Sequence, residues 1–232
     1  MEPCGEASER GECVGMPPQP QRRPLATREH AWAKALARRF DRAGITPNSI
    51  SIASVVVAVA AGLCLWGSGN ANGVARVILL LGAAALIQLR LLCNMLDGMM
   101  AIESGRRTNC GEIFNDMSDR FADIAILLGA GYSITTLAWG PTLGWIAALL
   151  AVLTAYVRLL GGAIGARQYF TGPMAKPHRM AVMTVASLLA TMEPLVHRQG
   201  VAITAALLVV IAGSLLTLAR RTLAIAAELR IR

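Results

Sequence analysis

Acidic and amide side chains recur at helical spacing within one short stretch of the chain, residues 94–119. Asn94 and Asp97 are three residues apart, and Asn115 and Asp119 are four apart, so each pair lies on one face of its helix. Carboxylate and amide oxygens suit a hard cation such as Mg²⁺, whose shell a diphosphate can complete. The stretch therefore predicts a pocket for a divalent cation and a charged head group.

Long apolar blocks on either side must position these groups. The 232 residues are 55% hydrophobic, and the mean hydropathy is +0.52. Blocks of about twenty residues can cross a hydrocarbon core of roughly 30 Å as helix. We expect six spans, at 48–67, 74–102, 111–137, 142–164, 179–195 and 200–219. The predicted fold class is an all-α integral membrane protein with six transmembrane helices preceded by a juxtamembrane amphipathic helix.

Ionisable side chains at membrane depth cost on the order of 2.5–3.5 kcal/mol each on insertion scales, so those near residues 94–119 are functional candidates. The net charge of +8 is not arranged as for nucleic acid binding. Basic residues precede the first span, follow the last, and fill alternate loops, whereas the other loops hold little charge. This positive-inside pattern predicts an even number of spans with both termini in the cytoplasm. The Arg- and Ala-rich composition favours a bacterial inner membrane.

The chain divides into four predicted parts. Residues 1–26 are polar, rich in Pro and Gly, and lack the apolar core of a signal peptide, so we expect a disordered cytoplasmic N-terminus. Residues 27–43 form an interfacial amphipathic helix, 44–219 the six-helix transmembrane catalytic domain, and 220–232 a basic cytoplasmic tail. The five cysteines show no paired spacing, which predicts free thiols and no zinc site.

The helix at 27–43 has an apolar and a basic face. Its faces are Trp32, Leu36 and Phe40 against Lys34, Arg38 and Arg42. Lying flat on the cytoplasmic leaflet is the preferred interpretation, and a plain soluble linker helix is the alternative. Thr46 or Asn48 could cap the first span, with Pro47 suited to a helix start.

The stretch 94–119 resembles the signature of the CDP-alcohol phosphatidyltransferase family, D-x2-D-G-x2-A-R-x8-G-x3-D-x3-D. The four acid positions fall on Asn94, Asp97, Asn115 and Asp119. The small residues fall on Gly98, Ala101 and Gly111, and the arginine falls on Ile102. The spacing is kept throughout, and five of the eight defined positions match.

The resemblance implies transfer of a phosphatidyl group from a CDP-lipid such as CDP-diacylglycerol to an alcohol acceptor, with release of CMP. It implies one or two Mg²⁺ or Mn²⁺ ions held by Asp97, Asn94, Asn115 and Asp119. Asp119 is then also the general base. The nucleotide would lie against Gly98, Ala101 and Gly111, and an anionic acceptor against Arg158, Lys176 and Arg179. A homodimer is a further family expectation, which Gly161 and Gly165 permit.

The departures from the signature leave alternatives open. Family members of the usual kind have four acids, whereas two are amides here, and an amide binds a dication more weakly than a carboxylate does. Glu112, Asp116 or Asp123 could compensate, although an arginine partner is the favoured reading of Asp123. Loss of the acids favours a second hypothesis, a non-catalytic relative that binds a lipid nucleotide or an anionic lipid. A transporter, a third hypothesis, lacks the expected broken helices or inverted repeat.

Overall fold

The computed structural model describes residues 35–36, 39–40, 42–103, 109–166, 169, 172–196 and 199–231. In this part of the chain all regular structure is helical. The long helices are α2 (Pro47–Asn70), α3 (Gly73–Glu103), α4 (Asn109–Ser133), α5 (Gly140–Ala163), α6 (Lys176–Ala190) and α7 (Val201–Ile231), with a short 3-10 helix η2 (Glu193–Val196) before α7.

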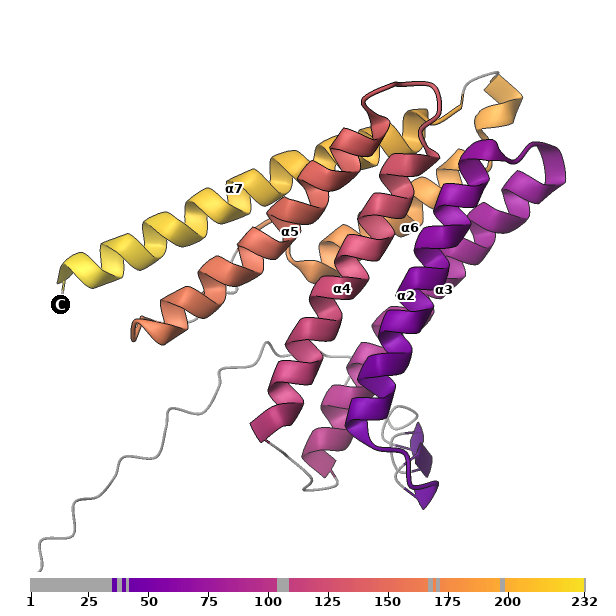
Figure 1. Ribbon diagram of the computed structural model, residues 1–232. Helices are drawn as coiled ribbons and strands as arrows, with labels where there is room; N and C mark the ends of the chain where they lie inside the picture. The colour runs from indigo at the N-terminus through magenta and orange to yellow at the C-terminus, as the bar shows by residue number, and fades with distance from the viewer. Residues whose placement is uncertain are drawn as a thin grey trace, which may run out of the picture.

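The six helices form one bundle (Figure 1), and each packs most closely against two others. These closest pairs follow the ring order α2, α3, α6, α7, α5, α4 and back to α2, and α4 also touches α7 and α3. Helices that follow one another in sequence are therefore not always neighbours. The end of α3 and the start of α4 lie at the same end of the bundle as the start of α2 (Figure 1).

Local signals in the sequence explain where α2 begins. The Thr46 side chain accepts a hydrogen bond from the Ser49 backbone amide at 3.3 Å, and Pro47 is the first helical residue. The prediction of a cap at Thr46 is confirmed. Prolines also occupy the first turns of α5 and α6, where their missing N–H group has no partner to lose.

Glycines allow α2 and α4 to approach until their backbones touch. A Cβ atom added at Gly62 would lie 2.4 Å from the Ala125 carbonyl oxygen, and one at Gly129 would lie 2.1 Å from the Gly62 carbonyl oxygen. Neither position has room for a methyl group. Such contacts between small residues are typical of helices packed within membranes.

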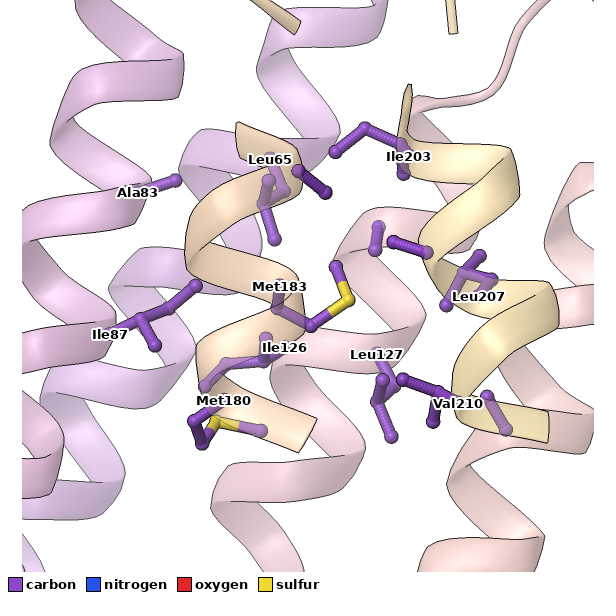
Figure 2. Packing of buried hydrophobic residues seen from close by; sticks show 14 of the residues in the cluster. Leu65, Ala83, Ile87, Ile126, Leu127, Met180, Met183, Ile203, Leu207 and Val210 are labelled. Atoms are coloured by element: carbon purple, nitrogen blue, oxygen red, sulfur yellow. The ribbon is translucent and has the colours of Figure 1, made fainter. Parts of the chain in front are cut away.

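Apolar side chains fill the ring from several helices at once (Figure 2). Leu65 of α2, Ile87 of α3, Ile126 of α4, Met183 of α6 and Leu207 of α7 are each fully buried in one cluster. Large apolar side chains also stay exposed on the outward faces of the helices. This distribution fits a bundle surrounded by lipid rather than by water.

Four helices in the described residues are long and apolar enough to cross a membrane: α2, α3 up to Met100, α5 and α7. The chain is therefore a multi-pass membrane protein. The expected spans at 111–137 and 179–195 correspond to α4, which carries several charged residues, and to α6, which has only 15 residues. These two helices do not meet the same measure of length and apolarity, so six spans remain a prediction.

The other boundaries differ from expectation in two places. α6 ends at Ala190, and Glu193 folds back to accept hydrogen bonds from the Gly200 and Ala202 amides at the start of α7. Arg76 pairs with this buried carboxylate at 3.0 Å. α7 continues through Ile231, past the expected end of the last span at 219. The predicted basic tail is thus a continuation of the helix over its described residues.

Most of the predicted amphipathic helix, and all of residues 1–26, lie outside the described residues. Positions 35, 36, 39, 40 and 42 are helical. Leu36 and Phe40 pack against a small apolar cluster that includes Ile50 and Leu96, at the ends of α2 and α3.

Candidate functional site

The polar faces of α3 and α4 meet as their spacing predicted. The Asn94 amide nitrogen donates to Asn115 Oδ1 at 3.1 Å and to Asp119 Oδ1 at 2.7 Å. Three of the four acid positions of the signature are thus joined by one amide group. An aspartate at position 94 could not donate these bonds while ionised.

Asp97, the remaining acid position, is 2% exposed and faces α2. Ser51 donates its hydroxyl to Asp97 Oδ2 at 2.7 Å. Asp97 Oδ1 is also buried, and it has no hydrogen-bond partner among the described residues. A buried carboxylate oxygen is costly without a partner, so this atom indicates a bound group. Ser51 was not predicted from the sequence; its place on the buried face of α2 was the available signal.

Asp119 is surrounded by donors. Its Oδ1 atom accepts from Arg90 at 3.2 Å as well as from Asn94, and it forms an ion pair with Lys176. Arg120 Nη2 lies 3.9 Å from the other oxygen, Oδ2. Lys176 is the first residue of α6, so this ion pair joins the start of α6 to α4.

Arg179 lies deeper, one turn below Lys176, and is committed to other protein groups. Its guanidinium pairs with Asp123 Oδ2 at 2.6 Å and donates to the Met174 carbonyl oxygen at 3.0 Å. Arg90 pairs with the other Asp123 oxygen at 3.5 Å. Both partners of the Arg179–Asp123 pair are at least 97% buried by side chain. The expectation that Asp123 pairs with an arginine is confirmed, and the predicted role of Arg179 at the acceptor stays a prediction.

Asp116 forms a third set of ion pairs at the more accessible edge. Arg158 of α5 contacts its Oδ1 atom at 2.8 Å, and Arg120 contacts the same atom at 3.2 Å. The Arg158 contact is an ion pair between helices, the alternative to its predicted role in phosphate binding. Its side chain is 22% exposed, so the Arg158–Asp116 pair is less buried than the Arg179–Asp123 pair.

We call these side chains the polar cluster. It contains four carboxylates and five cations: Asp97, Asp116, Asp119 and Asp123 with Arg90, Arg120, Arg158, Lys176 and Arg179. Cations thus outnumber carboxylates within the described residues. Such a cluster suits an anionic ligand better than a cation alone.

A divalent cation would find few unoccupied carboxylate oxygens in the polar cluster. No group of three His, Cys, Asp or Glu side chains that could hold a metal ion occurs among the described residues. Asp97 Oδ1 is a buried carboxylate oxygen without a partner among the described residues, and it lies on α3 three residues after Asn94. Such an oxygen suits a hard ion that takes its other ligands from phosphate and water. Asp119 Oδ1 already accepts hydrogen bonds from Arg90, Asn94 and Lys176, so protein donors occupy this carboxylate oxygen.

The remaining predicted site residues are on the same two helices. Gly98 is buried on α3, and Gly111 lies in the first turn of α4. Ala101 and Ile102 belong to α3, but their side chains, like that of Glu112, lie outside the described residues. Lys176 precedes the expected fifth span; burial lowers its pKa to about 8, and the Asp119 carboxylate opposes this shift.

The chain is similar to known proteins both in sequence and in fold. No protein-family model matches the chain. The phosphatidylinositol phosphate synthase of Mycobacteroides abscessus is 28% identical over 157 residues, which are 66% of this chain and 66% of that protein. The inner membrane protein YnbA of Escherichia coli is 27% identical over 150 residues, 65% of this chain and 70% of that protein.

Solved structures give the fold. The crystal structure of Mycobacterium tuberculosis phosphatidylinositol phosphate synthase with CDP-DAG bound has a TM-score of 0.68 and 21% identity, covering 83% of this chain and 92% of that chain. The same synthase in complex with manganese and citrate has a TM-score of 0.68 and 22% identity, covering 83% and 88%. The six-helix ring is therefore the fold seen in this phosphatidylinositol phosphate synthase.

Proposed function

We propose that the chain is a CDP-alcohol phosphatidyltransferase that moves a phosphatidyl group from a CDP-lipid such as CDP-diacylglycerol to an alcohol, in phospholipid biosynthesis. The observation that carries this proposal is the unpartnered, buried Oδ1 atom of Asp97 on α3, the helix that also carries Asn94. The signature spacing and the fold shared with a CDP-DAG-bound synthase support it. The relatives' name makes inositol phosphate the first acceptor to test.

In the transfer, the acceptor hydroxyl oxygen attacks the lipid-linked phosphorus of the CDP-lipid, and the bond from that phosphorus to CMP breaks. Asp97 and the amide oxygens of Asn94 and Asn115 would hold one Mg²⁺ or Mn²⁺ ion. When bound, the ion neutralises the diphosphate and eases the departure of CMP. Gly98, Ala101 and Gly111 leave room for the nucleotide, since none has a side chain beyond Cβ.

Asp119 accepts the proton of the attacking hydroxyl in this mechanism. Its Oδ1 atom is engaged by three donors, so we assign the proton to Oδ2, which has only Arg120 at 3.9 Å among the described residues. Lys176 and Arg158, both partly accessible, steer the anionic group of the acceptor. Arg179 supports them from the layer below through Asp123.

The topology we propose has six spans with both termini in the cytoplasm. The polar cluster includes Lys176 at the start of α6, and basic residues fill the sequence before α2, between α3 and α4, and before α6. A water-soluble acceptor would then enter from the cytoplasm, in a bacterial inner membrane. A homodimer is compatible with this arrangement.

A second candidate function is non-catalytic binding of a lipid nucleotide or an anionic lipid. It is favoured by the two amides at acid positions and by the three donors on Asp119. This candidate predicts saturable ligand binding without release of CMP.

Labelled CDP-diacylglycerol, Mn²⁺ or Mg²⁺ and a panel of alcohols distinguish the two candidates with purified protein in liposomes. Metal-dependent CMP release that requires one alcohol, and that is lost in Asp97→Asn and Asp119→Asn, is the expected result. Binding without turnover for every alcohol would favour the non-catalytic candidate. Full activity in both variants would refute the mechanism.

A further inference from the structure

Residues 172–175, just before α6, are fastened to α7, a helix that contributes nothing to the polar cluster. The Met174 backbone amide donates to Thr217 Oγ1 at 3.0 Å. Thr217, which is fully buried, donates its hydroxyl in turn to the Gly213 carbonyl oxygen at 2.7 Å. The hydroxyl therefore uses both its donor and its acceptor capacity, and its orientation is fixed.

Gly172 packs directly on the same threonine. Its φ is +137°, a backbone conformation that residues with a side chain rarely adopt. A Cβ atom at Gly172 would lie 2.4 Å from Thr217 Cγ2 and 2.8 Å from Thr217 Oγ1. Thr217 thus contacts the segment at two places, through its methyl group and through its hydroxyl.

The other side of the segment is held by α6. The Met174 carbonyl oxygen accepts from Arg179, which is itself anchored by Asp123. Lys176 lies between these two attachments, two residues after Met174 and three before Arg179. The position of its backbone is therefore set by Thr217 on one side and by Arg179 on the other.

We propose that Thr217 is a positioning residue that holds Lys176 at Asp119, where the ammonium group meets the anionic group of the acceptor. This inference rests on the proposed transferase function, in which Lys176 steers the acceptor. It gives α7 a part in substrate selection through a contact with the segment before α6. Loss of the Thr217 hydroxyl should weaken acceptor binding specifically.

The chain offers a matched control for this test. Ser214 lies three residues before Thr217 on α7 and is also fully buried, but its hydroxyl has no hydrogen-bond partner among the described residues. Thr217→Val removes the hydroxyl and keeps the shape of the side chain, whereas Thr217→Ser keeps the hydroxyl. Ser214→Ala removes a hydroxyl that forms no hydrogen bond with the described residues. All three are compared with the full-length protein in liposomes.

In Thr217→Val we expect the acceptor KM to rise about tenfold, the loss that one buried hydrogen bond commonly causes. The KM for CDP-diacylglycerol should stay within about twofold and kcat within about threefold, because Ser51 still holds Asp97, and Arg90 and Asn94 still hold Asp119. Thr217→Ser should restore the acceptor KM, and Ser214→Ala should match the wild type.

An acceptor KM in Thr217→Val equal to that in Ser214→Ala would overturn the inference. So would a uniform loss for both substrates that Thr217→Ser does not restore, because this would show a merely structural role. If the wild type releases no CMP with any alcohol, the proposed function fails separately. In that case, the affinity for inorganic phosphate is measured by calorimetric titration. Binding that is about tenfold weaker in Thr217→Val alone supports the inference about Thr217, and equal affinity in all variants refutes it.

Discussion

Replacement of Asp123 by Asn should destabilise the protein strongly although Asp123 lies outside the proposed chemistry. Asp123 Oδ2 lies 2.6 Å from Arg179 and Oδ1 lies 3.5 Å from Arg90, so one carboxylate joins α3, α4 and α6. The Asp123 side chain is 1% exposed, and Arg90 is fully buried. Asn keeps the shape but leaves these two guanidinium groups with less compensating charge.

Breaking a buried ion pair by removing one partner typically costs about 3–5 kcal/mol, because the remaining charge stays buried. For a chain of this size, each kcal/mol lowers the unfolding midpoint by roughly 2–4 °C. The expected loss for Asp123→Asn is therefore about 6–20 °C. Removing both charges with Asp123→Leu and Arg179→Met should recover part of this loss, since a buried pair is often replaceable by apolar groups.

Thermal unfolding followed by circular dichroism in detergent measures the effect, with Asp116→Asn as the matched control on the same helix. Asp116 pairs with Arg158 and Arg120, but its side chain is 28% exposed, so solvent screens these pairs. Exposed pairs contribute about 0–1 kcal/mol, which predicts a loss below roughly 4 °C. If Asp123→Asn melts within about 2 °C of the wild type, our account of the buried layer is wrong.

Three further predictions concern the site itself. Titration with Mn²⁺ followed by electron paramagnetic resonance should give one bound ion per wild-type chain, and two when Asn94→Asp and Asn115→Asp are combined with Lys176→Met; two ions in the wild type would contradict the assignment. Because Lys176 has a pKa of about 8 and must be charged to bind an anion, kcat/KM for the acceptor should fall as the pH rises through about 8. Lys176→Arg should stay active to higher pH, since a guanidinium remains protonated, and an identical pH profile would remove Lys176 from acceptor binding. Ser51→Ala should weaken Mn²⁺ binding at Asp97 severalfold by freeing the carboxylate to rotate, and unchanged affinity would show that the hydrogen bond does not orient it.

The sequence predicted those features that depend on helical period alone. Asn94 on α3 and Asn115 and Asp119 on α4 face each other because residues three and four apart share a helix face. The cap at Thr46 was predictable for the same reason, since capping uses residues only three apart. These relationships lie within one helix or across one short connection.

Contacts between helices that are far apart in the sequence could not be predicted, because these contacts depend on the order of the helices in the ring. Ser51 meets Asp97 from 46 residues away, and Lys176 meets Asp119 from 57 residues away. Arg179 was expected beside an acceptor, yet its place one turn into α6 buries it against Asp123. Helical periodicity indicates which face of α6 is polar, but it does not predict which residues of α4 this face contacts.

The contact between Gly62 and Gly129 makes the geometry of the site sensitive to positions that hold no polar side chain. α2 carries Ser51 and α4 carries Asp119, and the distance between the two helices is set where their backbones touch. Gly129 is ten residues from Asp119, about 15 Å along the helix axis. A methyl group at Gly129 would push α2 and α4 apart. Because both helices are stiff, the change in their relative tilt would also displace Ser51 and Asp119. Gly62 and Gly129 thus set the distance between the helix that carries Ser51 and the helix that carries Asp119.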